Sequence, residues 1–297
     1  MKIAISGASG LVGRRLLKLL AASGHTLHVF SRHAGTNLPP GVGISAWDPM
    51  RGPAPEAGLA GVDAIIHLAG EPVAQRWTEE AKRRIRESRV LGTRNLVEGM
   101  RRVAKPPKML LCASAIGYYG SRDDELLGES AGPGEGFLAE TCAAWEREAA
   151  AAEALGTRIM RIRIGVVLDP SGGALKRMLP PFRLGLGGRL GGGRQFMSWI
   201  HLDDLTAMFR FALETEAAGV WNGVAPNPVT NAEFTKTLAA ALHRPAVFPV
   251  PALALRALFG EMGGMLLDSQ RVFPRAAQAA GFQFEYPNLD AALRAML

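Results

Sequence analysis

The sequence predicts an α/β fold, in which a doubly wound parallel sheet precedes a smaller, mostly helical C-terminal domain on the substrate side. The first observation is an alternation of short apolar runs with longer helical patterns through residues 1–168. The second is a change of rhythm after Pro170, where glycine-rich and helical segments replace this alternation. Alternating strands and helices build parallel sheets, which bind ligands at the carboxyl ends of their strands. We therefore expect a ligand site in the first part of the chain.

A glycine loop near the N-terminus follows the first of these strands. Residues 3–5 are apolar and typical of a strand, Gly7, Gly10 and Gly13 follow, and leucines then recur at helical spacing. A dinucleotide pyrophosphate needs this order of strand, loop and helix. Gly7 permits the tight turn, Gly10 lets the backbone approach the phosphates, and Gly13 allows close packing of the helix. The loop therefore predicts a Rossmann-type dinucleotide site.

The end of the second strand indicates which nicotinamide cofactor binds. An NAD enzyme usually places an Asp or Glu there for the ribose 2′-hydroxyl, whereas an Arg accommodates the 2′-phosphate of NADP. Here residues 26–30 lead to Ser31 and Arg32, and the next acid is Asp48. A guanidinium offers a planar set of donors that suits a phosphate. We therefore expect NADP(H) rather than NAD(H).

The remaining elements follow from hydrophobic periodicity and from turn residues. Up to residue 168 we expect strands at 26–30, 42–47 (weakly), 63–68, 108–113 and 157–168, and helices up to 24, at 78–102 and at 137–155. Beyond it we expect helices at 199–213, 232–243, 251–260, 271–280 and 288–297, and a strand at 220–224. Thr230 and Glu233 have the spacing of a capped helix start. We divide the chain into a dinucleotide-binding domain, 1–225, with 170–199 as a lid-like insertion, and a C-terminal domain, 226–297.

Composition and charge exclude several classes of protein. The net charge is +7, but the arginines are scattered over helical patterns, so we expect no nucleic-acid partner. No apolar run approaches the roughly 18 residues of a membrane span, and the N-terminus enters a strand rather than a signal peptide. Cys112 and Cys142 are the two cysteines, which favours the cytoplasm over a disulfide framework. We expect a small-molecule substrate and no metal, and both monomer and homodimer stay open.

Several further motifs follow the strands and point to one family. They are the glycine loop 6–13, residues 67–72 after a strand, 89–93 on the next helix, Ser114 after the next strand, and 199–204 late in the chain. Together they resemble the extended short-chain dehydrogenase/reductase superfamily, in its nucleotide-sugar epimerase/dehydratase branch. Segments 117–120, 145–146, 181–188 and 222–226 are similar to one atypical subgroup, an NAD(P)-dependent "epimerase family" with its own C-terminal domain of unknown function. The resemblance covers essentially the whole chain.

The resemblance implies a set of cofactor contacts. They are Gly7, Ser9, Gly10, Leu11, Val12, Gly13, Ser31, Arg32, Leu68, Ala69 and Gly70. Val167 is similar to a residue whose backbone contacts the nicotinamide end. The superfamily commonly has Asn at the position of Arg89, so the contact that we expect from Arg89 departs from the family pattern.

The superfamily's usual chemistry needs a Ser that polarises the substrate oxygen, a Tyr that transfers a proton, and a Lys four residues after the Tyr. The Lys lowers the pKa of the Tyr and holds the ribose. This chain supplies Ser114 but no YxxxK, since its tyrosines are Tyr118, Tyr119 and Tyr286. Counting back from Glu146, the usual Tyr and Lys positions fall at about Leu138 and Cys142. We interpret Cys142 as a packed small residue.

Two functions remain open. In the first, the protein is an NADP(H)-dependent oxidoreductase or epimerase that acts at a hydroxyl or carbonyl, with Ser114 as polariser and Tyr118 or Tyr119 as proton donor or acceptor, helped by an arginine such as Arg122. In the second, it binds NADP(H) as a regulatory or scaffold protein with little turnover.

Two segments late in the chain complete the expected site. The loop 181–199, rich in glycine, is expected to cover the substrate pocket, where Arg183, Arg189 and Arg194 would bind an anion. Asp203 or Asp204 is expected as a helix N-cap and His201 as a packed or hydrogen-bonded residue.

Overall fold

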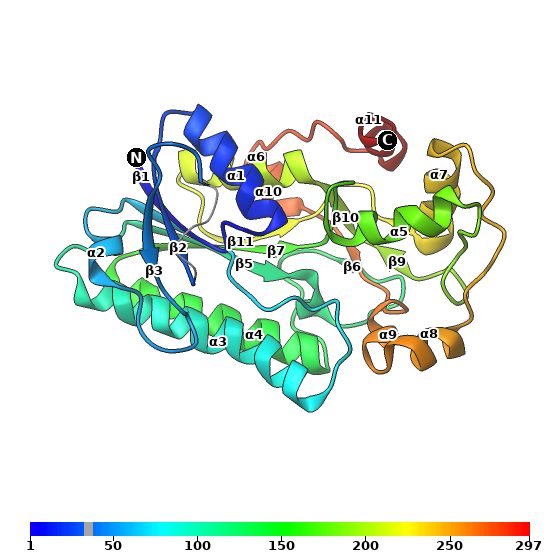
Figure 1. Ribbon diagram of the computed structural model, residues 1–297, viewed down its shortest axis with the longest axis horizontal. Helices are drawn as coiled ribbons and strands as arrows, with labels where there is room; N and C mark the ends of the chain where they lie inside the picture. The colour runs from blue at the N-terminus through cyan, green and yellow to red at the C-terminus, as the bar shows by residue number, and fades with distance from the viewer. Residues whose placement is uncertain (33–37) are drawn as a thin grey trace.

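The computed structural model describes residues 1–32 and 38–297 and contains a seven-stranded parallel sheet with helices on both faces (Figure 1). The sheet order is β11-β7-β5-β4-β1-β2-β3. Its strands are β1 (Lys2–Ser6), β2 (Thr26–Ser31), β3 (Gly43–Ala46), β4 (Ala64–His67), β5 (Met109–Ala115), β7 (Arg158–Ile164) and β11 (Gly219–Gly223). The expected doubly wound sheet is confirmed, including its weak third strand. His33, expected beyond the tip of β2, and residues 34–37 of the loop that follows lie outside the described residues.

Both faces of the sheet are covered, which explains why its strands are nearly continuous apolar runs. One face carries α1 (Leu11–Ala22) and α6 (Leu202–Glu214), and the other carries α3 (Glu79–Arg102) and α4 (Phe137–Ala150) (Figure 1). Ile3 and Phe209 belong to the core on the first face, and Ile65 and Trp145 to the core on the second. A short helix, α2 (Glu56–Leu59), was not expected, and its Leu59 belongs to the core on the second face.

The strand order creates a crevice beside β1. The chain adds β2 and β3 on one side of β1 and then crosses to add β4, β5 and β7 on the other side. In such sheets ligands bind outside the carboxyl ends of the strands, at the point where the order reverses. The loop that follows β1 lies at this point.

Gly165 divides the expected strand 157–168 into β7 and β8 (Val166–Leu168). A Cβ at Gly165 would lie 2.5 Å from the carbonyl oxygen of Ser198, so the two backbones approach closely. β8 then pairs with β10 (Trp199–His201), and for this reason the helix expected from residue 199 begins only at Leu202.

The N-terminus of α6 differs from the expectation. His201 is the N-cap, because its Nδ1 accepts a hydrogen bond from the backbone N–H of Asp203 at 3.0 Å. The prediction of Asp203 or Asp204 as N-cap is wrong, since both lie in the first turn of the helix. The prediction that His201 is packed or hydrogen-bonded is confirmed: it is buried and stacks on Tyr286 with ring centroids 4.0 Å apart.

The expected lid-like insertion contains a helix, α5 (Gly173–Arg183), and a glycine-rich stretch after it. This stretch is packed rather than free. A Cβ at Gly188 would lie 1.8 Å from the carbonyl oxygen of Phe248, and Gly191 and Val250 are joined by a hydrogen bond of 2.8 Å. The glycines therefore allow two backbones to approach each other.

The C-terminal region is mostly helical, as expected. It contains α7 (Asn231–Ala241), α8 (Ala252–Phe259), α9 (Met262–Met265), α10 (Arg275–Ala279) and α11 (Leu289–Met296). Short strand pairs join it to the rest: β12 (Val229–Thr230) with β9 (Phe196–Met197), and β13 (Arg271–Val272) with β6 (Leu126–Leu127). The capping box of Thr230 and Glu233 is confirmed at the start of α7. No helix among the described residues is long and apolar enough to cross a membrane.

Candidate cofactor and active site

The glycine loop after β1 leaves no room for a side chain at Gly7 or at Gly13. Gly7 has a φ of +74°, which L residues rarely adopt, and a Cβ there would lie 2.7 Å from the carbonyl carbon of Leu68. A Cβ at Gly13 would lie 2.4 Å from the carbonyl oxygen of Gly7. The turn is closed by a hydrogen bond from the Gly10 N–H to the Gly7 carbonyl at 3.0 Å. The backbone itself therefore forms the surface that a ligand would meet.

The N-terminus of α1 is open to an anion. Its N-cap is Gly10, and neither a side-chain cap nor an acidic residue is present in its first turn. Free N–H groups and the positive end of the helix dipole stabilise a phosphate at such a position. Leu11, Val12 and Gly13 supply these groups.

A cavity of about 340 Å³ lies over this loop. Its lining comes from the ends of four neighbouring strands: residues 6–10 after β1, 29–32 of β2, 47–50 after β3 and 68–72 after β4, together with Ser88 of α3. The structure thus brings together the predicted cofactor residues Gly7, Ser9, Gly10, Ser31, Arg32, Leu68, Ala69 and Gly70. The donor set and the cradle of glycines fit a dinucleotide phosphate.

Two acids, Asp48 and Glu71, also line the cavity, and Asp48 is the one just after the end of β3, beside β2. Its carboxylate is already engaged, because Oδ1 accepts the Met50 N–H at 3.1 Å and Oδ2 pairs with Arg51 at 3.3 Å. Arg32 is exposed at the same end. The end of the cavity beside β2 is therefore suited to a phosphate.

A buried histidine, His67, contacts the end of β1, where the glycine loop begins. His67 is fully buried at the end of β4, and its ring contacts the Ser6 Oγ at 2.6 Å and the Thr93 Oγ1 at 3.1 Å. Burial lowers the pKa of His67 to about 4, so the ring is neutral at neutral pH. Sequence analysis did not single out this role of His67, because its two partners come from β1 and α3.

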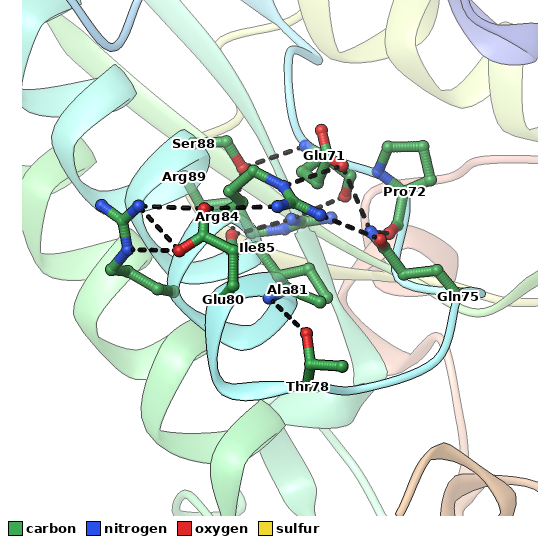
Figure 2. Close-up of polar contacts among 11 residues, drawn as sticks. Glu71, Pro72, Gln75, Thr78, Glu80, Ala81, Arg84, Ile85, Ser88 and Arg89 are labelled. Atoms are coloured by element: carbon green, nitrogen blue, oxygen red, sulfur yellow. Dashed lines mark hydrogen bonds and ion pairs between the residues drawn. The ribbon is translucent and has the colours of Figure 1, made fainter. Parts of the chain in front are cut away.

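The chain after β4, residues 69–78, forms a strap that is fixed to α3 (Figure 2). The Glu71 N–H donates to the Ser88 Oγ at 2.9 Å, and the Arg89 Nη1 donates to the Glu71 carbonyl at 3.0 Å. The Glu71 carboxylate faces Gln75 and Arg84, with an Arg84 Nε distance of 3.7 Å. These contacts hold the strap against the cavity.

The predicted contact Val167 lies away from this cavity, on β8, where it pairs with Ile200. The chain beyond it returns to the glycine loop, because a Cβ at Gly172 would lie 3.0 Å from Leu11 Cδ1. The segment after Val167 therefore approaches the N-terminus of α1.

Ser114 belongs to a buried ionic network on the α4 side of the sheet. Its Oγ donates to the Glu146 Oε1 at 2.6 Å, and Arg163 binds both Glu146 oxygens, through Nε at 2.8 Å and Nη2 at 2.9 Å. Burial opposes the charge of Arg163, but its bonds to Glu146 and Tyr119 raise the pKa of the guanidinium above its usual value. Since a hydroxyl has one proton, Ser114 in this arrangement offers only lone pairs to a further group.

The two tyrosines on the loop after β5 have different surroundings. Tyr119 is fully buried, donates to the Asn222 Oδ1 at 2.7 Å and accepts from Arg163 at 2.9 Å; burial raises its pKa. Tyr118 is partly exposed, and its ring lies 3.4 Å from the Arg163 Cζ. Arg122, the arginine considered from the sequence, turns to Glu125 instead.

Leu138 and Cys142, where the resemblance puts the usual Tyr and Lys, form an apolar surface beside Gly117. A Cβ at Gly117 would lie 3.3 Å from the Leu138 Cβ and 4.0 Å from the Cys142 Sγ. Burial raises the pKa of Cys142 to about 11, so its thiol is protonated at neutral pH. The interpretation of Cys142 as a packed residue is confirmed. The described residues also hold no group of three or more side chains placed to bind a metal.

Two known sequence families match parts of this chain. A model of the NAD dependent epimerase/dehydratase family matches residues 3–224, and a Domain of unknown function (DUF1731) matches residues 250–296. The chain belongs to the NAD dependent epimerase/dehydratase family. Both parts of the resemblance seen in the sequence, the family and the separate C-terminal domain of unknown function, are confirmed.

The alignments with two relatives cover essentially the whole chain. Epimerase family protein SDR39U1 of Mus musculus is 40% identical over 300 residues, which cover 99% of each chain. Epimerase family protein YfhF of Bacillus subtilis is 38% identical over 299 residues, which cover 100% of this chain and 98% of the relative.

Solved structures show the same fold. The crystal structure of human epimerase family protein SDR39U1 with NADPH has a TM-score of 0.88 and 37% identity, and the match covers 100% of this chain and 99% of the human one. MoeE5 in complex with UDP-glucuronic acid and NAD has a TM-score of 0.79 at 20% identity, over 100% of this chain and 97% of that chain; this match shows the fold alone.

Arg163, the centre of the ionic network, is a functional residue that the sequence pattern did not indicate. Arg163 stands in a central strand, where alternation with Arg161 suggested only a strand pattern. A charged residue in a strand that is covered on both faces needs a partner, which was the available signal. The partner, Glu146, was noted only as part of a motif.

Proposed function

We propose that the protein is an NADP(H)-dependent oxidoreductase or epimerase that acts at a carbon bearing a hydroxyl or carbonyl group. One observation carries the proposal: the glycine loop, with no room for a side chain at Gly7 or Gly13, and the uncapped N-terminus of α1 lie at one cavity. The human relative crystallised with NADPH supports the same cofactor. In our proposal Gly7, Ser9, Gly10, Leu11, Val12, Gly13, Leu68, Ala69 and Gly70 hold the dinucleotide, and Val167 approaches its nicotinamide end.

The choice of NADP(H) over NAD(H) depends on the β2 end of the cavity. Ser31 and Arg32 line it, and the carboxylate of Asp48 is engaged by Met50 and Arg51. A guanidinium binds a 2′-phosphate through several hydrogen bonds. We assign Arg32 to that phosphate.

For the reaction we assign the proton transfer to Tyr118. Bound cofactor would supply or accept a hydride at the reacting carbon. Tyr118 is the partly exposed member of the tyrosine pair, and it would give a proton to the new alcohol oxygen or take one from it. Tyr119 and Ser114 are engaged in the buried network, where they hold Arg163 and the loop of Tyr118 in place.

A second candidate function has its own supporting observation. Leu138 and Cys142 form an apolar wall where the family's usual acid–base pair would stand. This favours a protein that binds NADP(H) as a regulatory or scaffold component with little turnover. The two buried free cysteines are consistent with the cytoplasmic location that we expect for either function.

Turnover assays separate the two candidates. NADPH oxidation is measured with a panel of carbonyl compounds and nucleotide sugars, using wild type, Ser114→Ala, Tyr118→Phe and Tyr119→Phe. We expect Tyr118→Phe to lower kcat by about 10²- to 10⁴-fold while the Kd for NADPH is unchanged, because phenylalanine keeps the ring over Arg163. Turnover that survives Tyr118→Phe would contradict the assignment. Tight NADPH binding without turnover across the panel would favour the second candidate.

A further inference from the structure

Arg89 carries a guanidinium that forms no ion pair with any residue that the structure describes. Its Nη1 donates to two carbonyl oxygens, those of Glu71 and Ile85, both at 3.0 Å (Figure 2). Nε and Nη2 have no hydrogen-bond acceptor among the described residues, and no carboxylate there lies within ion-pair distance of Arg89. Two of its three nitrogens therefore remain available.

The surroundings of Arg89 shield part of this charge from water, since the residue is partly buried. A Cβ on Gly70 would lie 3.2 Å from the Arg89 Cζ, so the strap backbone lies directly against the guanidinium. On another side the Trp145 ring centroid lies 5.3 Å from the same atom. Burial lowers the pKa of Arg89, while Cys142 and the Glu71 carboxylate act in the opposite direction. A desolvated cation needs an anionic or hydroxyl partner.

Arg84, one turn earlier on α3, shows that such pairing is available on this helix. It is also partly buried, and it pairs with Glu80 at 3.3 Å and with Glu71 at 3.7 Å. The Glu71 carboxylate therefore pairs with Arg84, whereas Arg89 donates to the Glu71 carbonyl and interacts with the carboxylate only at longer range. Arg89 thus lacks a direct ion pair although an acid lies nearby.

The position of Arg89 indicates which half of a dinucleotide would meet it. Arg32 lies at the β2 end of the cavity, where the proposed function puts the 2′-phosphate of the adenosine half. Gly70 and Glu71 lie after β4, on the other side of β1 in the sheet. The nicotinamide half would extend in that direction, toward Arg89.

We propose that Arg89 binds the nicotinamide half of NADP(H), at its ribose and phosphate, and thereby supplies from α3 the cation that the family's lysine supplies from α4. The inference depends on the proposed function, because it takes the cavity as the cofactor site. The resemblance puts that lysine at Cys142, which lies three residues before Trp145, on the same face of α4. The guanidinium of Arg89 lies against Trp145 on this face of α4 and against Gly70 of the strap.

Calorimetric titration with two ligands tests the assignment. NADPH contains both halves, whereas adenosine 2′,5′-bisphosphate contains only the half that faces Arg32. We expect Arg89→Ala to weaken NADPH binding about 10- to 100-fold and to leave the Kd for the bisphosphate within about twofold, since a hydrogen bond from a charged group contributes about 1.5–3 kcal/mol. Arg86→Ala, at an exposed position on the same helix, is the matched control and should change neither Kd.

Two further variants guard against a purely structural effect. Arg89→Lys keeps a cation and should retain part of the NADPH affinity, and Cys142→Lys in the Arg89→Ala background should restore part of it by returning a cation to α4. Equal losses for both ligands would overturn the inference and give Arg89 the structural role of holding the strap. An unchanged Kd for NADPH in Arg89→Ala would also overturn it. Wild-type protein that bound neither ligand would overturn the proposed function itself.

Discussion

The cofactor cradle and the ionic network behind Ser114 solve the placement of charge in opposite ways. The cradle, residues 6–13, presents backbone N–H groups at the start of α1 and has no room for a side chain at Gly7 or Gly13. The network instead buries a full ion pair, Glu146 with Arg163, and surrounds it with hydroxyl groups. The difference teaches that the positive groups which would bind a ligand are left unpaired at the cradle, whereas the charges that stabilise the fold are buried and paired with each other.

The largest expected effect concerns the buried ion pair of Glu146 with Arg163. Glu146→Ala would leave Arg163 buried without its carboxylate, and we expect a loss of about 3–5 kcal/mol in the free energy of unfolding. Glu148→Ala, two residues further on α4, removes the exposed pair with Arg94 and should cost less than about 1 kcal/mol. Urea denaturation of both variants measures the difference. Similar losses in the two variants would show that the burial of Arg163 is not decisive.

Acid is expected to weaken the support of the cradle through His67. The folded state lowers the pKa of this ring from 6.5 to about 4, so between these pH values the unfolded chain binds the proton and the folded chain does not. The contribution is complete above pH 6.5 and falls by roughly 3 kcal/mol as the pH drops to 4. Denaturation curves of wild type and His67→Gln over this range should show a shallower pH slope in the variant. Parallel slopes would contradict the assignment.

The cradle itself is tested by Gly13→Ala. The new Cβ would lie 2.4 Å from the carbonyl oxygen of Gly7, so the loop must shift. We expect a loss of about 1–3 kcal/mol in stability, together with weaker NADPH binding. Gly132→Ala is the control, because a Cβ there meets nothing within 4 Å. NADPH affinity that survives Gly13→Ala would show that the close approach of α1 does not shape the site.

The smallest expected effect concerns the open end of the cavity. Arg32→Ala should weaken NADPH binding about tenfold, or about 1.4 kcal/mol, and leave NADH binding unchanged. Calorimetry with the two cofactors provides its own control, since they differ only in the 2′-phosphate. An equal loss for both would remove Arg32 from the phosphate site.

Local signals allowed the fold and the cradle to be predicted. The glycine spacing, the strand before it and the capping box at Thr230 each depend on residues a few positions apart, and the structure confirms the elements that they predicted. The network could not be predicted in this way, because Ser114, Glu146 and Arg163 come from a strand, a helix and another strand. The error at the start of α6 has a similar cause. The pairing of β10 with β8, a contact between distant segments, moved the first turn to Leu202.

The close packing between the two ends of the chain has a consequence for modularity. Residues 250–296 correspond to a separate sequence module. Its Ala277 and Phe282 are nevertheless buried in the core between the main sheet and helices α1 and α6, where Phe282 lies beside Phe211 of α6. A truncated chain would expose that core to water, so we expect the first module to lose stability without the second. We therefore expect the two modules to unfold in one cooperative transition.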